Sequence, residues 1–445
     1  MTRTGNTKNL GIRTLRRGVV ASILRLSTVV LFVGLVSGPA SASADDMVLR
    51  WNEIAASTST ATNPFNGARV LAIVQLSVFE AVNAITGDYE PYLSPATAAP
   101  AGASLDAAVI VAAHKALTTY FPAAAFPAQN VVLNAARDHD LGVIPDSPAK
   151  TAGIAVGLAA ANAMIALRAA DGSAPLTTTM PTSTVAGDYR LTSGCAAAVS
   201  YNWQGVTPFG IPDATAYLLS PPPSLGSQQY TKDYYEVMTV GSSSSTDRPL
   251  DRAEVARLYA ASSPGLVLSM AARQISAAKG LSPSENARAL ALIMMGINDS
   301  LVASFYNKYH YNLWRPETGI RNGESDGNRK TDGDAAFTTL IPTPCFPSYP
   351  SNHGSGTGGA VEMMRRLFGA AGHDITISNT VPALGSLPAT VITLHYTQLK
   401  DIADDVADAR VFGGIHWRFD QVAGSQLGRA VATEISKGFL SPVHP

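Results

Sequence analysis

The chain has few cysteine, aromatic and charged residues. Among 445 residues there are two cysteines, while aromatic side chains make up 7% and charged side chains 15%. Two cysteines cannot form the disulfide framework that replaces a core in small secreted proteins. Low charge together with 46% hydrophobic residues excludes an intrinsically disordered chain. The length therefore predicts a well-packed protein of two or three domain-sized units.

An excess of positive charge is also missing from most of the chain. Residues 1–44 contain six basic and no acidic side chains, so the remainder holds 26 basic and 33 acidic residues. A nucleic-acid-binding protein needs a basic face for the phosphate backbone. This composition argues against nucleic acid as a partner.

Only the N-terminus combines an apolar run with the features of an export signal. Basic residues precede the run Leu26–Val36, and Ala42-Ser43-Ala44 provides small residues for cleavage before Asp45. A membrane anchor is the alternative, but the run is shorter than the roughly 20 residues of a transmembrane helix. Arg16-Arg17 fits a twin-arginine signal loosely. We expect residues 1–44 to be removed, the protein to be exported to the periplasm or secreted, and no later segment to span a membrane.

The two cysteines, Cys195 and Cys345, permit a single disulfide in an exported protein. Cys345 also lies eight residues before His353, which would suit thiol chemistry. A buried thiol or one bridge is the simpler interpretation, and both forms remain open at this point.

Apolar residues recur at helical spacing on both sides of a Pro- and Thr-rich middle section, about 173–227. Ser282 and Glu285 have the spacing of a capping box, which predicts a helix from there to about Lys308. The other predicted helices are 68–85, 105–121, 149–170, 354–368, 397–410 and 421–437. We predict an all-α fold with two helical halves, 45–227 and 228–445, arranged as paired four-helix bundles around the loop-rich section.

A pair of basic residues, Lys308 and Arg315-Pro316, follows the predicted central helix. The two cations are seven residues apart, about two helical turns, so both can point to one side. Neighbouring aromatic residues make the segment partly buried, and buried cations need an anionic partner. Asp299, upstream in the same helix, is one candidate for that partner.

The stretch Pro350-Ser351-Asn352-His353-Gly354 precedes a helix start. Backbone N–H groups at a helix N-terminus bind anions, and the helix dipole favours negative charge there. Ser351 adds a hydroxyl donor, and His353 lies at the edge of such a site.

The third stretch is Arg410-x5-His416-x3-Asp420. If the chain is helical from His416, Asp420 lies one turn further on and can accept a hydrogen bond from the imidazole Nδ1–H. That bond fixes the tautomer and leaves Nε2 free as a nucleophile or a ligand. Together the three stretches provide the cations, donors and imidazoles of a site for phosphate or vanadate.

In order and spacing these stretches resemble the vanadium haloperoxidase and type-2 phosphatidic acid phosphatase superfamily. That superfamily is recognised by Lys-x6-Arg-Pro, Pro-Ser-Gly-His and Ser-Arg-x5-His-x3-Asp. Asn352 stands where Gly is usual, and Ala409 replaces the Ser before Arg410. The segments around Ala68-Arg69 and Gly413–Trp417 are similar to the exported bacterial branch related to vanadium chloroperoxidase. The resemblance implies an all-α fold of two four-helix bundles, with the site in the second.

The resemblance also implies roles for individual residues. His416 would be the ligand to vanadium, Asp420 would orient it, and His353 would act as acid and base. Phe346 matches the halide-pocket position that is Phe in chloroperoxidases. The vanadate oxygens would be held by five groups: Lys308, Arg315, Ser351, the backbone of Asn352, and Arg410.

Three functions are compatible with these residues. The first is a vanadate-dependent haloperoxidase that uses hydrogen peroxide, halide and a small organic substrate. The second is an exported acid phosphatase that hydrolyses phosphomonoesters through a phosphohistidine at His416. The third is a non-catalytic oxyanion-binding protein, which the departure at Asn352 would explain. We favour the first, because the chain lacks the spanning helices expected of a lipid phosphatase and is longer than small exported phosphatases.

Overall fold

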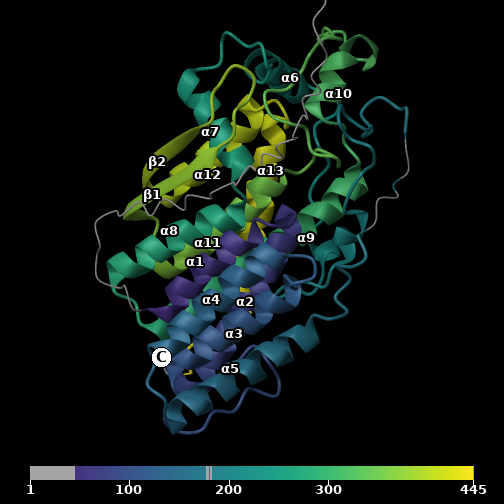
Figure 1. Ribbon diagram of the computed structural model, residues 1–445. Coiled ribbons are helices and arrows are strands. Elements are labelled where there is room, and N and C mark those ends of the chain that lie inside the picture. The colour runs from purple at the N-terminus through teal and green to yellow at the C-terminus, as the bar shows by residue number, and fades with distance from the viewer. Residues whose placement is uncertain (1–45, 177–179, 181–182, 444–445) are drawn as a thin grey trace, which may run out of the picture. The chain divides into compact units, whose positions relative to one another are not determined.

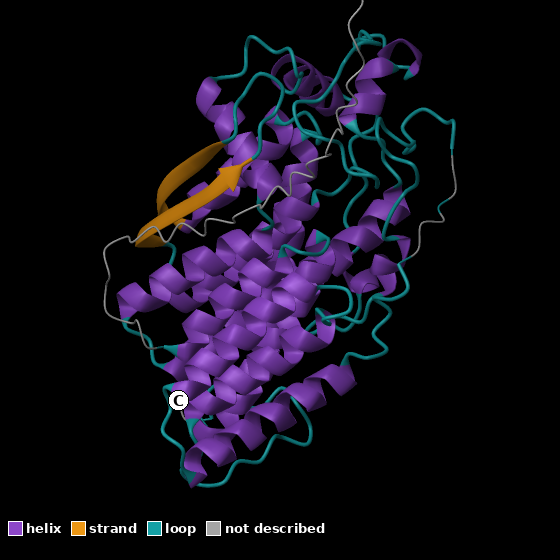
Figure 2. Cartoon of the chain, in the orientation of Figure 1, coloured by secondary structure: helices purple, strands orange, loops and turns teal. Residues whose placement is uncertain are grey.

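The computed structural model describes residues 46–176, 180 and 183–443, and these are mostly helical (Figures 1 and 2). The predicted export signal lies outside the described residues, so export stays a prediction. The mainly helical fold expected from the sequence is confirmed.

The first group of helices is centred on the long apolar helix α2. Its members are α1 (Met47–Ser59), α2 (Pro64–Thr86), α3 (Leu105–Tyr120), α4 (Pro127–Gly142) and α5 (Pro148–Leu167). Four of them begin at side-chain caps, because Asp46, Asn63, Ser104 and Ser147 each accept a first-turn N–H. Helix α2 is buried along most of its length and packs against α1, α3 and α5, while α4 packs against α3. The sequence predicted α2, α3 and α5 but not α1 or α4.

The described residues of the section 173–227 are loop-rich, as predicted, and form two short 3₁₀ helices, η1 (Tyr201–Gly205) and η2 (Ala214–Tyr217). The suggestion that Asp299 pairs with a site cation is wrong. Its buried carboxylate accepts hydrogen bonds from the N–H groups of Phe209 at 2.8 Å and Gly210 at 2.6 Å. Asp299 therefore holds this loop section against the central helix.

The second group of helices is built on the long helix α9 (Pro283–Tyr311), which packs against α2 and also against α11 and α13. The capping box of Ser282 and Glu285 at its start is present as predicted. The remaining members are α6 (Gln228–Val240), α7 (Leu250–Ala261), α8 (Pro264–Lys279), α10 (Pro316–Arg321), η3 (Gly323–Ser325), α11 (Asn352–Phe368), α12 (Leu399–Phe412) and α13 (Arg418–Gly438).

Helices α11 and α13 lie unusually close together. A Cβ on Gly428 of α13 would stand 2.1 Å from the Ser355 carbonyl oxygen of α11, so only glycine fits there. This close approach brings the start of α11 next to the start of α13.

A two-stranded antiparallel sheet, β1 (Ala371–Val381) and β2 (Thr390–Gln398), is the exception to the all-α prediction (Figure 2). Ile375 and Ile377 are buried on one face of β1 while their neighbours are more exposed. This period-two pattern of β-branched residues is typical of a half-buried strand. The sheet packs beside α7, α8 and α12.

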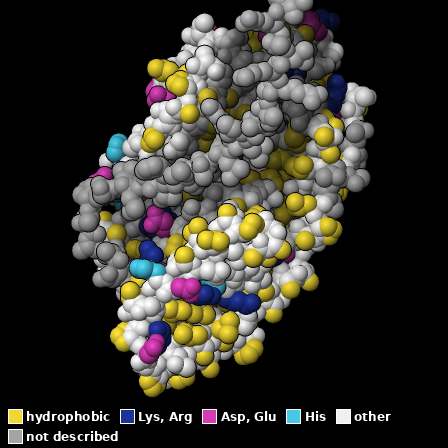
Figure 3. All heavy atoms as spheres, in the orientation of Figure 1, with side chains coloured by type: hydrophobic (Ala, Val, Ile, Leu, Met, Phe, Trp, Pro, Cys, Tyr) yellow, Lys and Arg dark blue, Asp and Glu magenta, His cyan; other side chains and the backbone are white. Residues whose placement is uncertain are grey.

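The expectation that no segment after residue 44 could span a membrane needs correction. Within the described residues, α2, α5 and α9 are long and apolar enough by length and composition. The apolar windows of α2 and α9 are 89% and 94% buried inside the protein, but that of α5 is 33% buried. Apolar side chains are visible on the surface at the lower end of the molecule in Figure 3, where Figure 1 labels α5.

Candidate oxyanion site

The three stretches that the sequence singled out meet at helix ends. Lys308 lies in the last turn of α9, Ser351 caps α11, Arg410 lies in the last turn of α12, and His416 lies two residues before the start of α13. Arg315 does not continue α9 as expected, because that helix ends at Tyr311 and Asn312 adopts a left-handed conformation. A short loop, rather than a shared helix face, therefore returns Arg315 to the site.

His416 and Asp420 are joined as the spacing predicted, although the helix begins two residues later than assumed. His416 Nδ1 lies 2.7 Å from Asp420 Oδ2, which also accepts the Trp417 N–H at 3.1 Å. Asp420 occupies the first turn of α13 and reaches back over its start. The buried carboxylate accepts a third hydrogen bond, from Ser348 Oγ at 2.6 Å. These contacts place the imidazole proton on Nδ1.

Arg315 acts on the other nitrogen of the same imidazole. Its Nη1 lies 2.9 Å from His416 Nε2 and also donates to the Ile415 carbonyl at 2.9 Å, while Nε donates to the Phe346 carbonyl at 2.8 Å. Because arginine only donates, His416 Nε2 must be the acceptor. The Nε2 lone pair therefore becomes available to a ligand when this N–H moves to another acceptor.

Lys308 is fully buried and donates to three backbone carbonyls of one loop. Its Nζ lies 3.0 Å from the Pro347 oxygen and 2.8 Å from the Ser348 oxygen, and it also contacts the Pro350 oxygen. An ammonium group has three protons, and these carbonyls use all of them. Burial and the neighbouring Arg315 lower the pKa of Lys308, but the three carbonyl acceptors stabilise the protonated form, so Lys308 holds the loop before Ser351 as a cation.

Arg410 and His353 are both affected by the Tyr259 backbone. Arg410 Nη1 donates to the Tyr259 carbonyl at 3.0 Å, and the same backbone opposes, in part, the lowering of the His353 pKa. Arg410 is 5% exposed, and burial lowers its pKa to about 9. Burial likewise lowers the pKa of Arg315 to about 10. The sequence offered no signal for Tyr259, since it acts through its backbone.

The site carries more positive charge than its own carboxylates balance. Within the described residues, Lys308, Arg315 and Arg410 form no ion pair within 4.0 Å. Burial raises the pKa of Asp420 to about 7, against the opposing effects of Ser348 and the cations. Two donor atoms, Arg315 Nη2 and Arg410 Nε, are buried without a hydrogen-bond partner. Buried charges of this kind need a counter-ion, so an anionic ligand is expected.

The start of α11 lies beside these cations. Ser351 Oγ accepts the Gly354 N–H at 3.1 Å, which leaves the hydroxyl proton for another acceptor. Asn352 is the first residue of the helix, and its N–H is one of the groups without an intrahelical partner. The arrangement is that of an anion site at a helix N-terminus.

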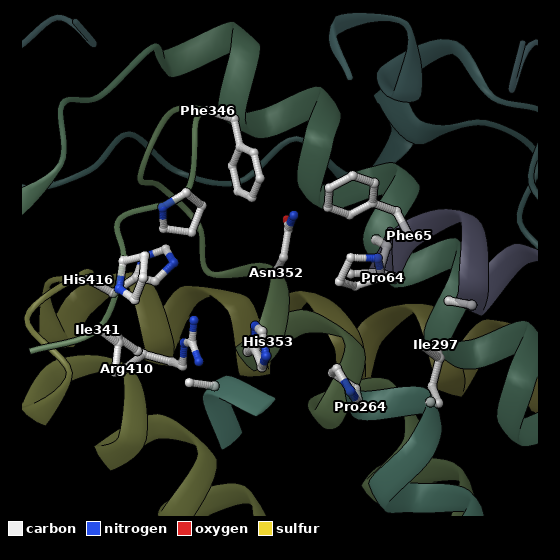
Figure 4. Close-up of a pocket in the computed structure, with 16 residues that line it drawn as sticks. Pro64, Phe65, Pro264, Ile297, Ile341, Phe346, Asn352, His353, Arg410 and His416 are labelled. Carbon is white, nitrogen blue, oxygen red and sulfur yellow. The ribbon is translucent and has the colours of Figure 1, made fainter. Parts of the chain in front are cut away.

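A cavity of about 310 Å³ opens onto these groups (Figure 4). Five predicted site residues line it, namely Phe346, Asn352, His353, Arg410 and His416. Lys308, Arg315, Ser351 and Asp420 lie behind that surface. The rest of the lining is apolar and includes Pro64, Phe65 and Ala68 from the start of α2. The first half of the chain therefore covers the site, which sequence reasoning missed.

A disulfide joins the loop of Phe346 to the middle section. Cys195 and Cys345 are bonded, with their Cα atoms 5.5 Å apart. Of the two forms considered from the sequence, a buried thiol and a single bridge, the structure contains the bridge. Since Cys345 directly precedes Phe346, the bridge ties one wall of the cavity to residues 183–199. Thiol chemistry at Cys345 is thereby ruled out in this structure.

Both histidines of the site should be neutral in the ligand-free protein. Burial lowers the pKa of His353 and of His416 well below the ordinary value, and the nearby arginines lower both further. At about pH 6, below the ordinary imidazole pKa of about 6.5, we expect both rings to show nitrogen NMR shifts of neutral imidazole. A bound oxyanion should raise both pKa values, because its negative charge offsets the cations. Protonation of His353 near pH 6.5 without ligand would contradict the electrostatics described here.

Comparison with known proteins gives a sequence match and a fold match. Residues 288–444 match the family model described as the VCPO second helical-bundle domain. Vanadium chloroperoxidase from Curvularia inaequalis is 27% identical over 180 residues, which covers 32% of this chain and 29% of that protein. The chain thus matches less than a third of the length of this curated relative.

The solved structures extend the likeness to most of the chain. A bacterial vanadium-dependent iodoperoxidase is 22% identical with a TM-score of 0.69, covering 89% of this chain and 96% of its own. The apo form of a bacterial vanadium-dependent chloroperoxidase is 15% identical with a TM-score of 0.69, covering 84% and 93%. The holo form is 16% identical with a TM-score of 0.67, covering 84% and 92%. The C-terminal part of the chain therefore matches a vanadium chloroperoxidase domain in sequence, and most of the chain shares the fold of bacterial vanadium-dependent haloperoxidases.

Proposed function

We propose that the protein binds vanadate at His416 and uses hydrogen peroxide to oxidise a halide. The observation that carries the proposal is the set of three buried cations without a carboxylate partner around a neutral imidazole. Such a set stabilises an oxyanion and the trigonal-bipyramidal geometry of its reactions. Asp420 supports this role by holding His416 in the tautomer whose Nε2 can bind a ligand.

The residues present fit vanadate. Arg315 Nη2 and Arg410 Nε are unpaired donors, Ser351 has a free hydroxyl proton, and His416 offers one nitrogen lone pair. An oxyanion would provide the acceptor that lets Arg315 leave His416 Nε2. Lys308 would act by charge, because its protons are used by carbonyls. When bound, vanadate supplies a Lewis acid that activates peroxide without a change in oxidation state.

His353 is the group placed to move the proton. It lines the cavity, and its lowered pKa keeps the ring neutral and able to accept a proton from hydrogen peroxide. A nearby anion would raise that pKa towards neutrality, which suits a group that later returns the proton. The apolar walls around Phe346 offer a surface for a small organic substrate, which the hypohalous acid formed can then halogenate.

The test is vanadate-dependent halogenation of monochlorodimedone with peroxide and bromide or chloride. We expect activity when orthovanadate is added, loss when vanadate is removed by dialysis against phosphate and chelator, and recovery on readdition. Hydrolysis of p-nitrophenyl phosphate by the metal-free protein, with no vanadate-dependent halogenation, would contradict the proposal and support the acid phosphatase alternative. Binding of vanadate without either activity would support a binding protein.

A further inference from the structure

Asn352 carries a buried donor without an acceptor. The side chain is 6% exposed, and its Oδ1 accepts a hydrogen bond from Ser304 Oγ of α9 at 2.7 Å. Its Nδ2 has no partner among the described residues. An unsatisfied buried amide costs free energy, so such groups in folded proteins usually meet a ligand or water. Asn352 also lines the cavity, so its acceptor can come from there.

The amide points towards the aromatic part of the cavity. Figure 4 shows the Asn352 carboxamide between Phe346 and Phe65, while Arg410 and His416 lie on another side. The two rings meet edge to face, with centroids 5.8 Å apart. The free donor is therefore directed to the apolar side of the cavity and away from the nitrogen that would hold the oxyanion.

The aromatic side of the cavity suits a small anion. Lys308 Nζ and the Arg315 guanidinium carbon lie 5.3 Å and 5.0 Å from the centroid of Phe346. Ring edges carry partial positive charge, and two cations near one ring add a positive field. A monatomic anion can use one N–H donor and ring edges, whereas a phosphate ester or a carboxylate needs several donors.

We propose that the side-chain amide of Asn352 donates a hydrogen bond to the halide and sets the preference among halides. This inference rests on the proposed function, since it concerns the substrate of the same site. Chloride is more strongly hydrated than bromide or iodide and so depends most on donors that replace its water shell. The contribution of Asn352 should therefore decrease from chloride to bromide to iodide.

The first test is halide kinetics of the vanadate-loaded Asn352→Gly variant. This change keeps a backbone N–H at the start of α11 and removes the amide. We expect KM to rise about tenfold for chloride, the typical effect of losing a hydrogen bond to a charged group, less for bromide and least for iodide. A KM that rises equally for all three halides, or for none, would overturn the inference.

Ser304 and Ser300 provide a matched pair of variants on α9. Ser304→Ala removes the hydroxyl that orients the amide, so the KM for chloride should rise about threefold while the amide remains. Ser300 is also buried but donates to the Gly296 carbonyl at 2.6 Å. Ser300→Ala should leave the ratio of the chloride and iodide KM values as in the parent. Equal effects of the two changes would mean that packing, not orientation, is responsible.

The second test does not depend on activity. Crystals of the protein soaked in sodium bromide should give an anomalous peak within hydrogen-bonding distance of Asn352 Nδ2, which Asn352→Gly should remove. Bromide at this position without any vanadate-dependent oxidation would refute the proposed function but keep the halide site. Vanadate-dependent oxidation with bromide elsewhere, or an adventitious surface ion only, would refute the halide site alone.

Discussion

His416→Ala should abolish vanadate binding and halide oxidation. Asp420 Oδ2 lies 2.7 Å from His416 Nδ1 and keeps the proton on that nitrogen, so the lone pair of Nε2 can bind a ligand. Perturbing groups that only orient such a ligand typically costs about 10- to 100-fold in affinity. Loss of the ligand itself should therefore lower vanadate affinity by more than about 100-fold. Titration with orthovanadate, followed by halogenation kinetics, measures both effects.

A matched control separates loss of the ligand from a general effect of removing a histidine. His395 is exposed on β2, away from the cavity, so His395→Ala should bind vanadate as the parent does. Urea unfolding of His416→Ala should remain cooperative. The substitution removes an uncharged ring and leaves a small cavity, which does not disrupt the whole fold. Vanadate affinity within a few-fold of the parent would show that His416 is not the ligand.

Lys308→Met should weaken both the fold and the oxyanion site. Methionine has a similar length, but it leaves the carbonyls of Pro347, Ser348 and Pro350 without their common donor. Buried acceptors left unpaired cost about 1–3 kcal/mol each. Relief of the repulsion between Lys308 and Arg315 offsets part of this, so we expect a net loss of about 2 kcal/mol in the free energy of unfolding. Urea denaturation measures it.

Vanadate affinity of the same variant should fall by more than the stability loss alone suggests, because one of the three buried cations is gone. Hydrogen exchange should quicken at the Ser348 and Ser351 amides, whose acceptors are the carbonyls of Leu313 and Asp420. Lys279→Met, at an exposed lysine in the last turn of α8, is the control and should change neither property. Unchanged stability in Lys308→Met would mean that the loop does not depend on this ammonium group.

Much of the architecture could be predicted because it depends on local geometry. The cap of α9 follows from the three-residue spacing of Ser282 and Glu285, and the His416–Asp420 bond from a four-residue spacing. The helices that were missed, such as α4 and α6, are shorter or more polar. The hairpin was missed although β1 shows the alternation of a strand, because its surroundings are helical.

The sequence by itself determined which residues can make an oxyanion site, since three ordered stretches carry the cations, the hydroxyl and the imidazoles. Only the tertiary structure decided which contacts each of these residues makes in the site. Lys308 donates to a loop about forty residues away, Arg315 contacts His416 Nε2, and Phe65 from the first half of the chain closes the cavity. Asn352 departs from the motif, and its proposed role as a donor to the halide follows only from the contact with Ser304, which orients its amide. These contacts join residues far apart in the chain, and long-range packing leaves no periodic or spacing signal in the sequence.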